Sequence, residues 1–117
     1  MSKISELVRE SLKKVNVFPS ISITPAIAKE LLELNTDNRP VKERTVMLYS
    51  EQMKEGHWKF NGDSIRFSKA GRLIDGQHRL LAIIKSGTTQ VFNIQTGLDD
   101  ESFAVIDIGK NRSAGDV

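Results

Sequence analysis

The chain has no cysteine among its 117 residues. This excludes disulfides, thiolate metal sites and thiol chemistry, and it fits a reducing compartment. Aromatic residues are also few, with one tryptophan and one tyrosine, so an aromatic platform that stacks single-stranded bases is poorly supported. The sequence has no signal-peptide pattern and no apolar run as long as a membrane span. We therefore expect a soluble, cytoplasmic protein with no membrane partner.

A large excess of one charge is lacking too, since the formal net charge is only +2. The charges are nevertheless uneven: residues 39–79 hold nine basic and five acidic groups, whereas residues 80–117 hold three and five. A basic middle third indicates a phosphate-bearing partner, and the candidates for nucleic-acid binding are Lys54, Lys59 and Arg66. An ordinary solvated surface with both signs explains the same distribution, so both interpretations stay open.

Hydrophobic periodicity predicts helices and short strands within one domain, residues 1–117. Helices are expected at 2–14, 25–34, 41–55 and 76–87, and strands at 20–23, 64–67, 72–74, 90–94 and 103–106. The strands at 64–67 and 72–74 are separated by a turn and predict a hairpin. Residues 1–19 are expected to be an N-terminal helical extension. Residues 113–116 look like the start of another element, which suggests that the chain is the N-terminal part of a longer protein.

The segment from Asp75 to Arg79, with the sequence Asp-Gly-Gln-His-Arg, lies where a strand pattern changes into a helix pattern. Gly76 permits a sharp backbone turn there. The N–H groups at the start of a helix carry partial positive charge, and phosphate suits that position. Gln77 lies within this turn, and His78 and Arg79 would add two side-chain donors. The pattern therefore predicts a phosphate site.

Each residue of this turn also has a simpler explanation. Gly76 could serve only the backbone geometry, and Arg79 could pair with a surface carboxylate. Asp75 is favoured as a helix cap; it could instead orient Arg79, hold a metal bound to a nucleotide, or act as a base. His78 is a candidate acid or base near neutral pH, although no partner is identifiable. Pairing it with His57 in a metal site lacks any ligand spacing, so no protein metal site is predicted.

Two further groups of residues have ordinary structural explanations. Tyr49 and Trp58 are most simply aromatics at the edge of the core. A polar cluster follows the last expected strand, at Asp107, Lys110, Asn111 and Arg112. A solvated loop is slightly favoured for this cluster, but such a loop at a strand end could also close over a ligand.

The stretch from Asn38 to Ile94 resembles the N-terminal domain of the ParB and sulfiredoxin-like superfamily. Asn38-Arg39-Pro40 and the helix ending at 53–57 are similar to the opening of that domain. A hairpin then leads into Asp-Gly-Gln-His-Arg, which resembles the glycine-started, arginine-containing phosphate turn of the family in its phage and bacterial form. The resemblance implies an α+β fold, with a small mixed β-sheet flanked by helices.

By this resemblance, Gly76 and the N–H groups after it would meet nucleotide phosphates, with His78 and Arg79 as side-chain ligands. Sulfiredoxins have a reactive cysteine directly after the glycine, whereas this chain has Gln77, so sulfinic-acid reduction is excluded. Partition ParB proteins tend to have an acidic residue and paired arginines there. Gln77-His78-Arg79 differs from that pattern, and CTP hydrolysis is therefore not implied.

The favoured function is a phosphate- or nucleotide-binding domain of phage or mobile-element origin that acts on or with nucleic acid. If it is an enzyme, we expect NTP hydrolysis, phosphotransfer or nuclease action, with Mg²⁺ brought by a nucleoside triphosphate and Asp75 or His78 as the catalytic acid or base. One alternative is a non-catalytic DNA-binding or regulatory module. Another is a small interaction protein that inhibits a host system through helix 41–55. A homodimer and a host-protein partner are both compatible with these alternatives.

Overall fold

The structure is a computed structural model that describes residues 1–36 and 40–100. Over these ranges the elements follow one another as α1 (Lys3–Ser11), β1 (Asn16–Ile23), α2 (Pro25–Leu32), α3 (Glu43–Lys54), β2 (Ser64–Ser68), β3 (Leu73–Asp75), α4 (Gln77–Ser86) and β4 (Gln90–Leu98). Every element expected between residues 1 and 100 is present. The strand expected at 103–106, the polar cluster at 107–112 and the element expected from residue 113 lie outside the described residues.

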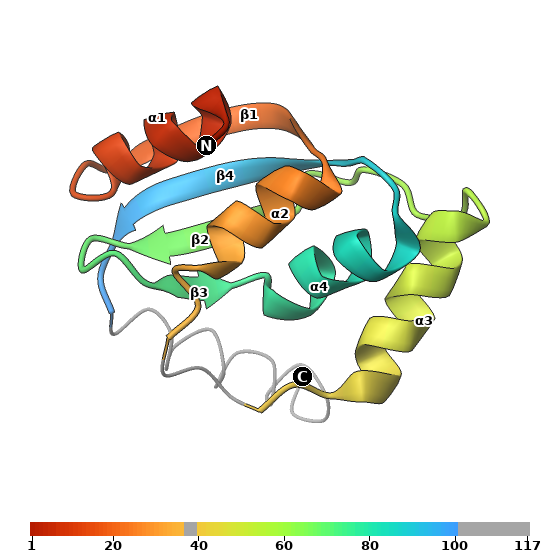
Figure 1. Cartoon of the computed structure of the whole chain (residues 1–117). Helices are drawn as coiled ribbons and strands as arrows, with labels where there is room; N and C mark the ends of the chain where they lie inside the picture. Colours follow the sequence, from red (N-terminus) through yellow and green to blue (C-terminus); the bar gives the residue numbers. More distant parts are fainter. Residues whose placement is uncertain (37–39, 101–117) are drawn as a thin grey trace, which may run out of the picture.

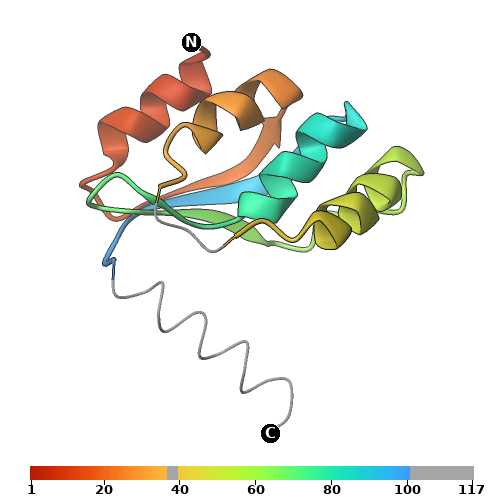
Figure 2. The same cartoon turned by 60° about the horizontal axis from the view of Figure 1, so that its bottom comes forward.

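The four strands form one mixed sheet in the order β1-β4-β2-β3. The outer pairs, β1 with β4 and β2 with β3, are antiparallel, while the central pair of β2 and β4 is parallel. Helices α1, α2 and α4 lie on one face of the sheet, and α3 lies beyond α4 at the margin (Figures 1 and 2). This arrangement confirms the predicted α+β fold with a small mixed sheet flanked by helices. The predicted hairpin of β2 and β3 is also confirmed.

Local sequence signals define several element ends. The side chain of Thr24 accepts a hydrogen bond from the N–H of Ile27, and Pro25 begins α2. This is the cap followed by proline that the sequence predicts. Helix α4 ends at Gly87, whose φ of 69° is left-handed, so the glycine terminates the helix as expected.

Strand β1 is longer than predicted and corrects the boundary of the N-terminal segment. It begins at Asn16, so residues 16–19 are strand and only α1 is helical within the expected extension 1–19. The register with β4 shifts between Phe18 and Ile21, around Pro19, and Ser20 has a positive φ of 51°. Because proline interrupts the alternating pattern, the first half of the strand had no clear signal. Its pairing with β4, far away in sequence, makes it a strand.

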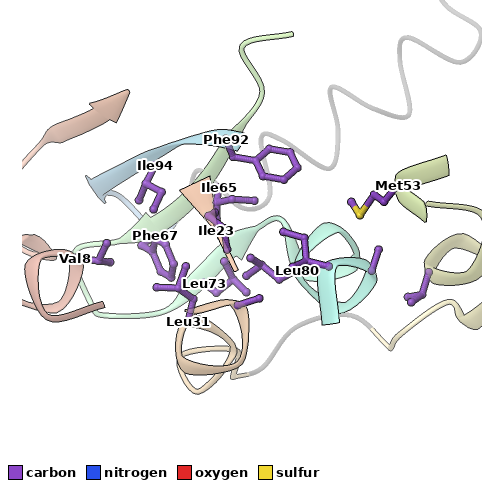
Figure 3. Close-up of a cluster of buried hydrophobic side chains, with 14 residues drawn as sticks. Val8, Ile23, Leu31, Met53, Ile65, Phe67, Leu73, Leu80, Phe92 and Ile94 are labelled. Atoms are coloured by element: carbon purple, nitrogen blue, oxygen red, sulfur yellow. The ribbon is translucent and has the colours of Figure 1, made fainter. Parts of the chain in front are cut away.

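The core lies between the sheet and the helices on its covered face (Figure 3). The strands contribute large buried side chains, including Ile65, Phe67, Leu73, Phe92 and Ile94, and the helices contribute Val8, Leu31, Leu80 and Ile83. Tyr49 and Trp58 pack at its edge, with ring centroids 5.0 Å apart. Both aromatics therefore have the core-edge position that the sequence suggested.

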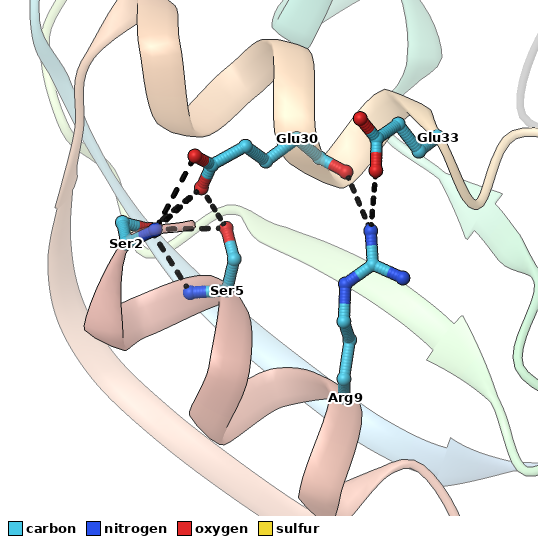
Figure 4. Close-up of polar contacts among 5 residues, drawn as sticks. All are labelled: Ser2, Ser5, Arg9, Glu30 and Glu33. Atoms are coloured by element: carbon cyan, nitrogen blue, oxygen red, sulfur yellow. Dashed lines mark hydrogen bonds and ion pairs between the residues drawn. The ribbon is translucent and has the colours of Figure 1, made fainter.

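Helix α1 docks on α2 through a polar contact centred on Glu30 (Figure 4). The Glu30 carboxylate accepts hydrogen bonds from the Ser5 hydroxyl at 2.6 Å, from the Ser2 hydroxyl at 2.8 Å and from the Ser2 backbone N–H at 3.1 Å. Arg9 adds an ion pair with Glu33 at 2.9 Å. The hydrogen bonds from Ser5 and Ser2 stabilise the charged form and lower the pKa of Glu30 to about 2.

Candidate functional site at the start of helix α4

The turn from β3 into α4 has the backbone geometry that the sequence predicts. Strand β3 ends at Asp75, Gly76 is the N-cap with φ 117° and ψ 5°, and no side chain caps the helix. The first hydrogen bond of the helix runs from the N–H of Leu80 to the carbonyl of Gly76, at 3.0 Å. The N–H groups before that of Leu80 therefore donate to no carbonyl of α4, as at any helix start.

Both the packing around position 76 and the backbone conformation of the turn require glycine there. A Cβ on Gly76 would lie 2.6 Å from Cδ1 and 3.2 Å from Cγ2 of Ile65. Ile65 belongs to β2 and is fully buried. The backbone of the turn thus rests directly on the core, and this close approach accounts for the glycine whether or not a ligand binds.

Asp75 does not cap α4, and the favoured prediction for this residue is wrong. Its Oδ2 accepts a hydrogen bond from Arg66 at 2.6 Å, and its Oδ1 lies 3.5 Å from the Nη2 of Arg79. The carboxylate thus joins two guanidinium groups, one from β2 and one from the first turn of α4. Of the roles considered for Asp75, this contact corresponds to orienting Arg79.

The Arg79 guanidinium interacts with other groups of the protein. Its Nη2 donates to the carbonyl of Ser64 at 2.8 Å, and its Nη1 lies 3.7 Å from the Asp63 carboxylate. Its Cζ is 5.3 Å from the centroid of the Phe92 ring, and only 13% of the side chain is exposed. The alternative that Arg79 pairs with carboxylates is therefore realised. Arg79 thus holds α4 to the start of β2, and its charge is paired with two carboxylates.

His78 brings the starts of two helices together. Its Nε2 accepts a hydrogen bond from the backbone N–H of Lys42 at 3.0 Å. Lys42 is the N-cap of α3 and, like Gly76, has no side-chain cap bond. An imidazole nitrogen that accepts a hydrogen bond carries no proton, so His78 contributes an acceptor at this position. A side-chain hydrogen bond therefore joins the first turn of α4 to the start of α3.

The remaining predicted ligands are only partly gathered here. Gln77 is the first residue of α4 and is half-exposed. Lys54 ends α3, about 18 Å along the helix axis from Lys42 at a rise of ~1.5 Å per residue. Lys59 is exposed in the loop before β2, and Arg66 donates to Gln95 as well as to Asp75. Of the three candidates for nucleic-acid binding, Arg66 therefore contacts the turn through Asp75, whereas Lys54 lies at the far end of α3.

No protein-family model, curated protein or solved structure matches the chain. The resemblance to the ParB and sulfiredoxin-like superfamily therefore rests on the residues of the turn and on the order of elements around it.

Two kinds of feature are absent from the described part of the chain. Within residues 1–36 and 40–100, no three histidine, aspartate or glutamate side chains are grouped so that they could hold a metal ion. Over the same residues, no helix has the length and apolar character of a membrane span.

Sequence reasoning missed the contact between Lys42 and His78 and the hydrogen bond from Arg79 to Ser64. The first joins residues 36 positions apart and carries no local signal. The second joins residues 15 positions apart and carries no local signal either. The spacing of four residues between Asp75 and Arg79 indicates only the contact between these two side chains, which was among the roles considered for Asp75.

Proposed function

We propose that this chain is a phosphate-binding domain that takes a nucleotide or a nucleic-acid phosphate at the start of α4. The observation that carries the proposal is the hydrogen bond between Lys42 and His78, which joins the start of α3 to the first turn of α4. Neither N-cap residue, Lys42 or Gly76, caps its own helix through a side chain. An anion in front of them would interact with the positive ends of both dipoles.

Distinct roles follow for the residues of this site. The backbone N–H groups of Gln77 and Arg79 act as donors to phosphate oxygens, and the exposed side chain of Lys42 supplies a mobile cation. The guanidinium of Arg79 acts on the backbone of the site, since its hydrogen bond to Ser64 fixes the turn, and its charge is paired with the carboxylates of Asp75 and Asp63. Arg79 is thus a positioning residue here rather than a direct ligand.

A nucleoside triphosphate with Mg²⁺ is compatible with this site when the phosphates carry the metal, because the turn offers N–H donors and the start of α3 offers the side chain of Lys42. Mg²⁺ would neutralise charge between the phosphate oxygens. If phosphoryl chemistry takes place, His78 is the better candidate acid or base, since it borders the turn. Asp75 holds two arginines and serves as a charged acceptor.

The test is a thermal-shift panel of ATP, ADP, CTP, GTP and short duplex DNA with Mg²⁺ on the wild-type chain. A ligand that binds only the folded state raises Tm; at a concentration of 100 times Kd the gain is about 2.7 kcal/mol. We expect at least one phosphate-bearing ligand to raise Tm by several degrees. If none does, the proposal is wrong.

Lys42→Glu is the informative variant, and Lys54→Glu is its matched control at the other end of α3. Both lysines are exposed, and each exchange changes the charge equally. The ligand-induced shift should shrink in Lys42→Glu and persist in Lys54→Glu. Equal shifts in the two variants would place the binding site elsewhere. A shift with DNA that falls steeply as salt is raised would favour nucleic acid over a free nucleotide.

A further inference from the structure

Helix α3 has a buried side that attaches it to the rest of the molecule. Val46 is 5% exposed and Met53 3%, and Ser50 lies between them on the same side. This side packs against α4. The attachment leaves the opposite side of α3 at the margin of the molecule, away from the sheet (Figure 1).

That opposite side is composed of Arg44, Met47, Leu48 and Glu51, which we call the outer face of α3. The four residues are spaced at i, i+3, i+4 and i+7, so they share one side of the helix. All four are exposed, with Met47 at 44% and Leu48 at 45%. Two large apolar side chains thus meet solvent between a cation and an anion.

The outer face is self-complementary when it meets a second copy in the antiparallel direction. With a two-fold axis between positions 47 and 48, Met47 faces Leu48 of the second copy, and Arg44 faces Glu51 of the second copy. The symmetry repeats each contact, so both apolar pairs and both ion pairs form together. A parallel arrangement would instead place Arg44 against Arg44, which is unfavourable.

We propose that the outer face of α3 is a homodimer contact whose occupant is the same face of a second copy of this chain. The charge pattern selects the antiparallel orientation, and the apolar pair forms the desolvated centre. A helix of 12 residues is about 18 Å long. One such helix pair is smaller than most stable interfaces, so we expect a weak dimer that depends on concentration.

The test is a sedimentation-velocity series of the full chain without nucleotide, from micromolar to about millimolar concentration. The wild type should shift from monomer to dimer over this range. Arg44→Glu and Glu51→Arg should each weaken the dimer by roughly tenfold or more, because each creates two like-charge contacts across the axis. Lys29→Glu, on the exposed surface of α2, changes the charge as much as Arg44→Glu and should have little effect.

The double variant Arg44→Glu/Glu51→Arg separates this geometry from a general charge effect. It restores opposite charges at both symmetric contacts, so dimerisation should return to within a few-fold of the wild type. Circular dichroism would verify that each variant is folded. A wild type that remains monomeric at the highest concentration overturns the proposal. A dimer that the single exchanges do not weaken, or that the double exchange does not restore, overturns it as well.

Discussion

Replacing Gly76 with alanine should destabilise the fold through two separable effects. The first is conformational: φ at Gly76 is 117°, a value that side chains rarely adopt, and such strain costs about 1–3 kcal/mol. The second is steric, because the new Cβ would lie 2.6 Å from Cδ1 of the buried Ile65. Overpacking of this kind costs about 1–3 kcal/mol. We therefore expect the free energy of unfolding to fall by about 2–6 kcal/mol in total.

Gly87→Ala is the matched control, because Gly87 also has a positive φ, of 69°, but nothing lies within 4 Å of a Cβ there. It should lose only the conformational part, about 1–2 kcal/mol. Urea denaturation followed by the fluorescence of Trp58, the single tryptophan, measures both variants. If both variants lose the same stability, the close approach to Ile65 does not exist.

A double-mutant cycle isolates the steric part directly. Ile65→Val removes Cδ1, the nearest atom to the new Cβ, and in the wild-type background it should cost about 0.5–1.5 kcal/mol. Combined with Gly76→Ala, the same exchange should cost at least about 1 kcal/mol less, because it relieves the overlap. Strict additivity of the two variants would refute the steric reasoning.

Three more predictions concern stability. Gly97→Ala should cost more than about 4 kcal/mol or prevent folding, since a Cβ there would overlap the Lys14 backbone and φ is 76°. The pKa of Glu30 is lowered from 4.5 to about 2. The charged carboxylate therefore stabilises the fold fully above about pH 5, and this stabilisation disappears as the pH falls toward 2. Glu30→Gln should remove this acid-dependent loss of stability. Asp75→Asn should lower stability by about 1–3 kcal/mol, because it removes the charge that Arg66 and Arg79 contact.

The same urea assay tests all three predictions, and each has its own contradicting result. A Gly97→Ala chain of nearly wild-type stability would mean that β4 does not pass this close to the loop before β1. For Glu30, wild type and Glu30→Gln must be compared from pH 6 to pH 2; parallel curves would exclude the hydrogen bonds from Ser2 and Ser5. For Asp75, a loss below about 0.5 kcal/mol would show that the two arginine contacts contribute little.

Local signals were sufficient wherever an element depends on its own residues. Thr24 and Pro25 specify the start of α2, and Gly87 specifies the end of α4, because caps act over a few positions. The glycine at the strand-to-helix turn was recognised for the same reason. In contrast, the first half of β1 was missed, since its extended conformation depends on pairing with β4 about eighty positions away.

The role of the turn residues could be predicted only in part. The sequence identified the turn and its N–H groups, but it favoured Asp75 as a cap. The hairpin places Arg66 directly beside Asp75, and a carboxylate beside two guanidiniums binds them in preference to a backbone N–H. Which partner Asp75 takes depends on the register of β2 and β3, and a sequence pattern does not give that register.

The sequence alone determined that this chain is a small α+β protein without thiol chemistry, with a glycine turn that opens a helix. Hydrophobic period, caps and glycines are local properties, and they act wherever the chain is placed. Only the tertiary structure decided that Arg79 points to Ser64, that Asp75 binds two arginines, and that the start of α3 meets His78. These contacts join residues from separate elements, and packing of the elements against one core sets the distances between them.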